Sequence, residues 1–155
     1  MMGEGSFTYT PLPENVTVGK YSSIARDCRF HDGGTHLYEK NKKVVFTINW
    51  DQIREVPPII IGNDVWLGEG VRVLTGVTIG DGVIVGAGAV ISKDIPPFAV
   101  VVGNSQRIVR FRFTPEQIAL LQKIKWWDWP EPLIRERIED MKDISVFLKK
   151  YYVSE

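Results

Sequence analysis

The two histidines of the chain, His31 and His36, are the side chains best suited to moving a proton near neutral pH. Both lie in the segment RFHDGGTHLYE, and imidazole is the side chain whose unperturbed pKa lies close to neutrality. A group with such a pKa can act as a general base toward a hydroxyl or an amine. We therefore expect one of them to be a general base, and the alternative interpretation is that both are solvated.

A repeat of six residues must position these side chains. From Ile61 the chain reads IGNDVW, LGEGVR, VLTGVT, IGDGVI, VGAGAV and ISKDIP, with aliphatic residues at the first and fifth positions. The second position is often glycine, as expected for turns that need positive φ or a close approach of backbone. The period of six fits neither a helix nor an antiparallel meander. It predicts a parallel β-helix in which three hexads form one coil and the aliphatic columns stack inside.

The same register is present earlier, in VGKYSS and IARDCR at positions 18–29, and it places Cys28 at an inward position where packing is its expected role. Between Phe30 and Ile61 the spacing is not a multiple of six, which indicates an insertion at about 37–57. Insertions in solenoids form loops on one face and often carry function. His36 falls six residues after Phe30, at a position that would point inward. We expect the chain to leave the coil there and to deliver His36 to a surface cleft.

The tail of the chain predicts helices. Thr114 and Gln117 in TPEQ form a capping box around Pro115, and a first helix is expected to about Trp126. Ile134, Ile138 and Met141 mark a second. The predicted organisation is a β-helix over 1–113 and a helical segment over 114–155.

Composition excludes several kinds of partner. Lys and Arg total 19, as do Asp and Glu, so no net charge favours nucleic acid. No apolar stretch approaches the length that spans a bilayer, and the N-terminus lacks a signal sequence. A single cysteine fits a reducing compartment. We therefore expect a cytoplasmic protein with no nucleic-acid partner and no membrane span.

The hexads, the following VVGNSQRIVR and the segment RFTPEQIALLQKIKWWDWP together resemble the hexapeptide-repeat acyltransferases. Within these the chain is most similar to the xenobiotic acetyltransferase group, which includes type B chloramphenicol and streptogramin acetyltransferases and many sugar acetyltransferases. The resemblance covers positions 16–130. It implies left-handed coils, a homotrimer with active sites between subunits, and acetyl-CoA as cosubstrate.

The resemblance also implies roles for individual residues. The catalytic histidine of the family follows a GGN or GxN turn before the inserted loop, and GGTH places His36 there, with Thr35 as a departure; Asp32 and Glu55 are candidates to orient it. Backbone N–H groups of the glycine-rich turns are candidates to stabilise the oxyanion. The family pattern assigns CoA contacts to Ala87, Ser92, Lys93, Arg107, Arg110 and, in the groove between subunits, Trp66. The alternative interpretation is that the basic residues are solvated and Trp66 is an ordinary interface aromatic. No metal is expected, because zinc enzymes with this fold need three histidines per site.

The expected function is acetyl transfer to a hydroxyl or amino group of a saccharide or nucleotide-linked sugar. An antibiotic acceptor is the alternative, weakened because LYEKNKKVVF stands where antibiotic-modifying members carry a Ser-Thr-Tyr-Pro-Phe-like stretch. A non-catalytic assembly or binding module is the alternative from another class.

Overall fold

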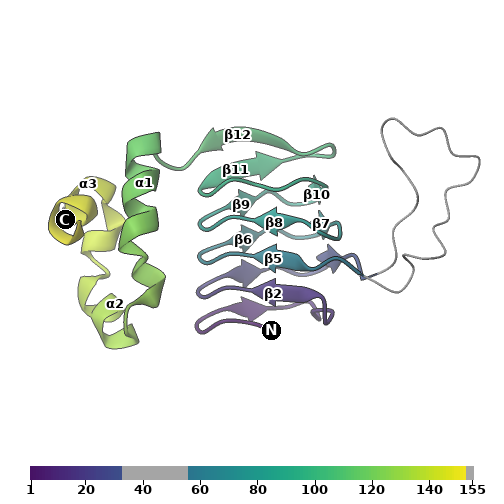
Figure 1. Ribbon diagram of the computed structural model, residues 1–155, viewed down its shortest axis with the longest axis horizontal. Helices are drawn as coiled ribbons and strands as arrows, with labels where there is room; N and C mark the ends of the chain where they lie inside the picture. The colour runs from purple at the N-terminus through teal and green to yellow at the C-terminus, as the bar shows by residue number, and fades with distance from the viewer. Residues whose placement is uncertain (33–55, 153–155) are drawn as a thin grey trace, which may run out of the picture. The chain divides into compact units, whose positions relative to one another are not determined.

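A computed structural model describes residues 1–32 and 56–152 of the 155-residue chain (Figure 1). His36 and residues 37–55 of the predicted insertion lie outside the described residues. The chain divides into two compact units, Met1–Arg110 and Phe111–Glu155, and each is described by itself.

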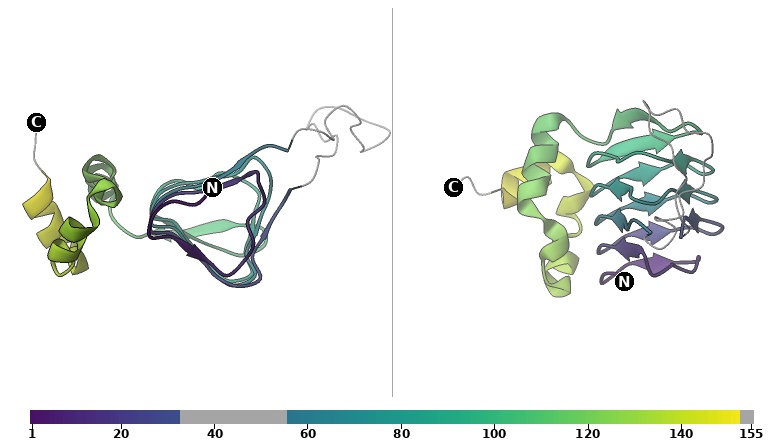
Figure 2. Two further views of the ribbon diagram at one scale, coloured as in Figure 1. Left: turned by 90° about the horizontal axis from the view of Figure 1, so that it is seen from below. Right: turned by 45° about the vertical axis from the view of Figure 1, so that its right-hand side comes forward.

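The first unit is a parallel β-helix with three faces, and Figure 2 shows the triangular outline of its coils. We name each face by one strand: the β2 face (β2, β5, β8), the β6 face (β1, β3, β6, β9, β11, β12) and the β7 face (β4, β7, β10). Among β1 to β11, the paired strands run parallel within each face. The strands are β1 Phe7–Thr8, β2 Val16–Val18, β3 Ser23–Ile24, β4 Arg29–Phe30, β5 Ile59–Ile61, β6 Trp66–Leu67, β7 Arg72–Val73, β8 Thr78–Ile79, β9 Ile84–Val85, β10 Val90–Ile91, β11 Ala99–Val102 and β12 Arg107–Phe111.

The core is the double aliphatic column that the hexads predict. Ile61 pairs with Ile79, three hexads further along, and Leu67 pairs with Val85 in the same way. Every first-position and fifth-position residue from Ile61 to Ile95 is at most 3% exposed, and so is Cys28. Burying one such aliphatic side chain contributes roughly 1.5–3 kcal/mol. The prediction of a parallel β-helix with an aliphatic interior is confirmed.

The glycines at the second and fourth hexad positions have different roles. Those at the second position permit close approach: a Cβ on Gly68 would lie 2.7 Å from the backbone nitrogen of Ala87 on the next coil. The fourth position has the left-handed backbone that favours glycine, as at Gly82, where φ is 68°. Phe98 occupies the equivalent position in the last coil with φ of 59°, and its buried ring lies where a Cβ on Gly82 would be.

One hexad differs from the prediction. Ile95 pairs with Ile79 and therefore occupies a first position, whereas the ISKDIP repeat predicts a fifth position for it. The corner after Ile91 is thus two residues shorter than a full hexad. The Asp94 carboxylate closes this corner by accepting a hydrogen bond from the backbone N–H of Thr78 at 2.7 Å. Ser92 and Lys93 consequently lie in a tight turn.

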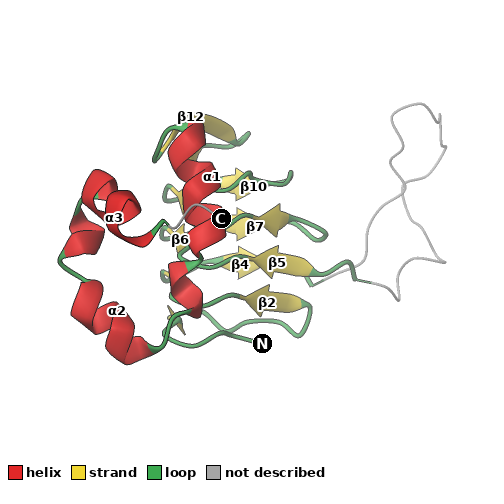
Figure 3. Cartoon of the chain, turned by 60° about the vertical axis from the view of Figure 1, so that its left-hand side comes forward, coloured by secondary structure: helices red, strands yellow, loops and turns green. Residues whose placement is uncertain are grey.

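The second unit contains three α-helices among its described residues (Figure 3): α1 Pro115–Ile124, α2 Glu131–Arg137 and α3 Ile144–Tyr151, with single 3-10 turns at Trp126–Asp128 and Asp140–Lys142. The predicted capping box of Thr114 and Gln117 is present, and α1 ends two residues before Trp126. The predicted second helix corresponds to α2 but stops at Arg137. The sequence prediction missed α3, which begins after Asp143 accepts two backbone N–H groups with its side chain. Among the described helices, none is long and apolar enough to cross a membrane.

Candidate active site

The ends of the insertion are held together by one side chain that the sequence did not single out. The Asn15 amide donates to the backbone oxygen of His31 at 2.9 Å and to that of Pro57 at 3.4 Å. His31 directly follows strand β4, and Pro57 precedes strand β5. Asn15 therefore fixes the point at which the histidine-bearing segment leaves the β-helix and the point at which the chain returns.

Two outward columns run along the β7 face next to this point. The first contains Arg29, Arg72 and Val90, which are neighbours in strand register. The second column runs from His31 past Leu74 to Ser92, as the backbone bonds from His31 to Val73 and from Leu74 to Ile91 show. Because adjacent strands are roughly 4.8 Å apart, His31 and Ser92 lie about 10 Å apart along the coil axis. The exit of the insertion and the predicted CoA residue Ser92 thus share one edge of the β-helix.

The turn carrying Lys93 is fixed by Gln106, which sequence reasoning also missed. The Gln106 amide oxygen accepts the backbone N–H of Ser92 at 2.6 Å and that of Lys93 at 3.0 Å, and its amide nitrogen donates to the Lys93 carbonyl at 3.0 Å. Gln106 stands next to the Asn104–Ser105 peptide, which is cis. The Lys93 ammonium remains on an exposed side chain of a defined turn.

The structure does not bring all the predicted CoA residues to one face. Ala87 is exposed at the corner between β9 and β10, at the opposite edge of the β7 face from Ser92 and Lys93. Trp66 points outward from the β6 face and is 55% exposed. Arg107 and Arg110 both lie on β12, where strand alternation directs them to opposite sides.

The backbone N–H groups of the turns at the Ala87 corner already donate hydrogen bonds within the coil. The N–H groups of Gly68 and Gly86 donate to Val85 and Val101, and those of Gly70 and Gly88 donate to Arg26 and Glu69. Such N–H groups cannot also stabilise an oxyanion without breaking the coil's own hydrogen bonds. Ser92 and Lys93 are excluded in the same way by Gln106.

Cys28 has the packing role that the repeat predicts. Its Sγ lies 3.3 Å from the carbonyl oxygen of Gly68, inside the coil. Burial raises the pKa of the thiol, partly offset by backbone hydrogen bonds from Val71 and Gly70. A buried thiol with a raised pKa is a poor nucleophile, so Cys28 is not part of the site.

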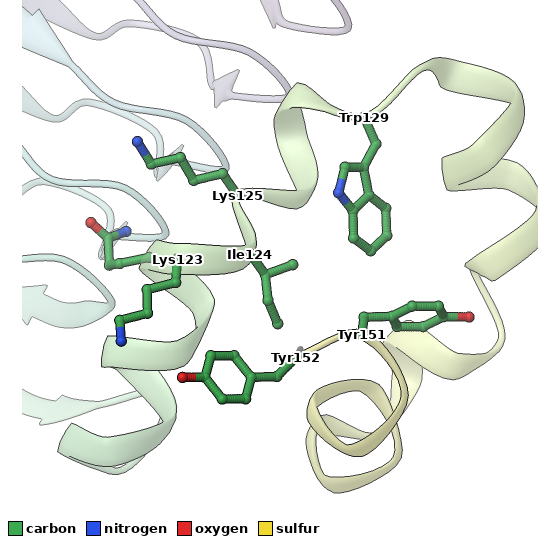
Figure 4. Close-up of a pocket in the computed structure, with 7 residues that line it drawn as sticks. Lys123, Ile124, Lys125, Trp129, Tyr151 and Tyr152 are labelled. Carbon is green, nitrogen blue, oxygen red and sulfur yellow. The ribbon is translucent and has the colours of Figure 1, made fainter. Parts of the chain in front are cut away.

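The helical unit contains a pocket that includes none of the predicted site residues (Figure 4). Its lining consists of Gln122, Lys123, Ile124, Lys125, Trp129, Tyr151 and Tyr152. Lys123 lies in the last turn of α1 and its ammonium is 5.8 Å from the Tyr152 ring centroid. Lysines near a helix C-terminus interact favourably with the last carbonyl groups. We therefore interpret Lys123 and Tyr152 as residues that pack the helices of this unit together.

Comparison with known protein families identifies the class to which the first unit belongs. The family described as bacterial transferase hexapeptide (six repeats) matches residues 58–93, which contain the hexads of the central coils. Together with the three parallel faces, this match makes the first unit a left-handed parallel β-helix of the hexapeptide-repeat transferase class.

The chain belongs to the hexapeptide-repeat acetyltransferase family. It is 31% identical over 142 residues to a probable macrolide acetyltransferase from Lysinibacillus sphaericus, covering 84% of this chain and 79% of that protein. It is 31% identical over 134 residues to a chloramphenicol acetyltransferase from Escherichia coli, covering 79% of this chain but only 64% of that protein. A maltose O-acetyltransferase from Clostridium difficile superposes with a TM-score of 0.55 at 28% identity, covering 73% of this chain and 59% of that one.

Proposed function

We propose that this protein transfers the acetyl group of acetyl-CoA to a hydroxyl or amino group of a saccharide or nucleotide-linked sugar in the cytoplasm. The observation that carries the proposal is membership of the acetyltransferase family. It is supported by the β-helix edge at which both the start of the histidine-bearing insertion and the Lys93 turn lie. The similarity to a maltose O-acetyltransferase supports a sugar acceptor. Residues 1–113 form the transferase domain in this proposal, with 114–155 as a helical appendage.

His36 is the proposed general base. Its neutral imidazole removes the proton of the acceptor as the acceptor oxygen or nitrogen attacks the thioester carbonyl carbon. The tetrahedral intermediate then collapses, the C–S bond breaks, and the CoA sulfur leaves with the proton that the imidazole returns. Acetyl passes directly to the acceptor, so no residue of the protein is acylated.

Lys93 is the proposed phosphate contact for CoA, with Ser92 beside it. The hydrogen bonds between Gln106 and Lys93 support this role. A cation on a fixed turn loses less conformational freedom on binding than one on a free loop. Ala87 and Trp66 are proposed to line the path of the pantetheine arm. Arg107 and Arg110 are proposed to meet the phosphates, one from each side of β12.

A homotrimer with active sites between subunits completes the proposal. Its support is the outward column of the β6 face, in which four of five residues are apolar: Phe7, Ser23, Trp66, Ile84 and Val100. Phe7 is 50% exposed and Trp66 55% exposed. A contiguous exposed apolar patch is typical of a surface that another subunit covers.

An antibiotic acceptor is the second candidate, favoured by the names of the macrolide and chloramphenicol acetyltransferases that the chain matches. Both candidates share the CoA half of the reaction and differ only in the acceptor. Product analysis with amino and nucleotide sugars beside chloramphenicol distinguishes them.

The experiment that tests the proposed function is calorimetric titration of acetyl-CoA into the wild-type protein and into Lys93→Ala. We expect a dissociation constant in the micromolar range, which corresponds to about −8 kcal/mol, and clearly weaker binding by the variant. Lys149→Ala, in the last turn of α3, is the charge-matched control and should bind as the wild type does. Absence of binding by the wild type would favour a non-catalytic assembly module.

A further inference from the structure

We propose that Arg29 and Arg72 form a paired site for a phosphate or diphosphate group carried by the acceptor. The inference rests on the proposed acetyltransfer and deepens it, because it restricts the acceptor to phosphorylated compounds such as a sugar phosphate or a nucleoside-diphosphate sugar.

The two arginines stand side by side. Arg29 and Arg72 are register partners on β4 and β7, so both side chains project outward from the same face of neighbouring strands. Adjacent parallel strands are separated by about 4.8 Å. Both residues are exposed, and neither forms an ion pair with another residue of ranges 1–32 and 56–152. Among the described residues, no carboxylate competes for the two guanidinium groups, so one ligand can bind both.

The repulsion between the two guanidinium groups destabilises the β-helix, and a bound anion removes this repulsion. Like charges directly opposite each other on neighbouring strands destabilise a sheet. A carboxylate carries a single negative charge, whereas a phosphate ester or a diphosphate offers two, which matches two guanidinium groups. Each planar guanidinium also presents parallel N–H donors with the geometry that phosphate oxygens accept. A phosphorylated ligand accordingly suits this pair better than a neutral sugar or a monocarboxylate.

Position assigns the phosphate to the acceptor and not to CoA. Arg29 precedes His31 by two residues, at the exit of the histidine-bearing insertion that Asn15 holds. Arg72 lies on the following coil, and the Lys93 turn proposed for CoA comes one coil later, after Val90. Along the β7 face the arginine pair is therefore on the first two coils and the CoA contact on the third.

The test is calorimetric titration of uridine diphosphate and, separately, of inorganic pyrophosphate into the protein saturated with free CoA. We expect the wild type to bind uridine diphosphate, and Arg29→Gln and Arg72→Gln each to weaken that binding by about 10-fold or more, because each removes charge-assisted hydrogen bonds. Arg29→Lys and Arg72→Lys keep the positive charge but lose the two parallel N–H donors of the guanidinium group. These variants should bind uridine diphosphate with intermediate affinity. Arg135→Gln, on α2, removes an equal charge and should leave binding unchanged.

Acetyl-CoA titrated into the same variants separates the outcomes. The proposal predicts that acetyl-CoA binds Arg29→Gln and Arg72→Gln as it binds the wild type. If both variants lose acetyl-CoA affinity as Lys93→Ala does, the pair belongs to CoA and the proposal is overturned. It is equally overturned if neither probe binds the CoA-saturated wild type, or if the glutamine variants bind both probes normally. Failure of the wild type to bind acetyl-CoA would instead refute the proposed acetyltransfer, and with it the assignment to an acceptor.

Discussion

Gln106 illustrates how a single half-buried side chain can define a site on this fold. It accepts the N–H groups of Ser92 and Lys93 and donates to the carbonyl of Lys93. Because β10 is the last strand of the β7 face, Gln106 supplies the acceptor that a further coil would have provided, as Ile91 does for Leu74. The contact joins residues thirteen and fourteen positions apart. No local spacing rule in the sequence indicates it.

Replacing Gln106 should loosen the Lys93 turn. Because the freed N–H groups are exposed and can bind water, Gln106→Ala is expected to lower the free energy of unfolding by only about 1 kcal/mol. Acetyl-CoA affinity should fall several-fold, since the Lys93 turn is then no longer preorganised. Urea unfolding and calorimetry measure the two effects. Gln106→Glu keeps the acceptor but loses the donor to the Lys93 carbonyl and adds a negative charge beside the proposed phosphate contact, so it should bind more weakly still. Equal binding by the alanine variant would remove Gln106 from the site.

His36 is the residue whose role rests most heavily on family resemblance. His36→Ala is expected to lower turnover by at least ~100-fold, as loss of a general base does, while the trimer and acetyl-CoA binding remain. Steady-state rates with CoA release as the readout provide the measurement. His31→Ala is the matched control, because His31 is exposed and its backbone N–H already pairs with Val73. Inactivity of the His31 variant with an active His36 variant would reverse the assignment.

At the scale of elements, the hexad columns were predictable because burial on this fold repeats with a fixed period. A first-position or fifth-position aliphatic residue points inward whichever coil it belongs to, so the whole interior follows from spacing alone. The shortened corner was not predictable, because ISKDIP satisfies the hexad pattern by chance while Ile95 belongs to the next repeat. Phe98 shows the same limit, because an aromatic residue stands where the pattern favours glycine.

Much of the candidate site could not be predicted, for a related reason. Arg29 and Arg72 become neighbours only once the insertion is closed and the register across it is known. Asn15 contacts His31 and Pro57, which are 16 and 42 positions away. The sequence could indicate that an insertion begins after Phe30, but the side chain that holds its ends, Asn15, comes from the preceding coil.

The anchoring of α3 in the helical unit should depend on pH. Lys150 Nζ and Tyr151 Oη each donate to the Asp140 carboxylate at 2.6 Å, and the Lys150 hydrogen bond, followed by that of Tyr151, lowers the pKa of Asp140. A carboxyl group with a lowered folded-state pKa contributes stability above its unfolded pKa, near 4. That stability is lost as the pH falls through the lowered folded-state pKa.

Acid titration followed by far-UV circular dichroism should therefore show loss of helix beginning below about pH 4. Asp140→Asn removes the ionisable group, so part of this acid dependence should disappear and the helical unit should be less stable at pH 7. Glu139→Gln is the control, because the Glu139 carboxylate forms an exposed ion pair with Lys142. Lys150 and Tyr151 donate their hydrogen bonds to Asp140 instead. Identical acid profiles for wild type and Asp140→Asn would show that the cluster does not anchor α3.

At the scale of the whole molecule, the β6 face is unusual among the three faces. Its outward column contains four apolar residues, one serine and no charge. The β2 face presents Thr17, Ile60 and Thr78, and the β7 face presents Arg29 and Arg72. The polar and charged faces suit solvent and ligands, and the apolar one suits a subunit contact. The β6 and β7 faces meet at the corner that contains Ala87, so a contact on one would bring a neighbouring subunit to the edge of the other.

Light scattering should accordingly give a mass in solution near three times the 17.6 kDa of one chain. Trp66→Glu should shift the protein toward monomer, because it buries an unpaired carboxylate in the proposed contact. Ile60→Glu changes an exposed apolar residue of the β2 face, 46% exposed, and should leave the trimer intact. A trimer that survives Trp66→Glu but not Ile60→Glu would move the contact to the β2 face. A monomeric wild type would mean that one chain alone must supply every contact to both substrates.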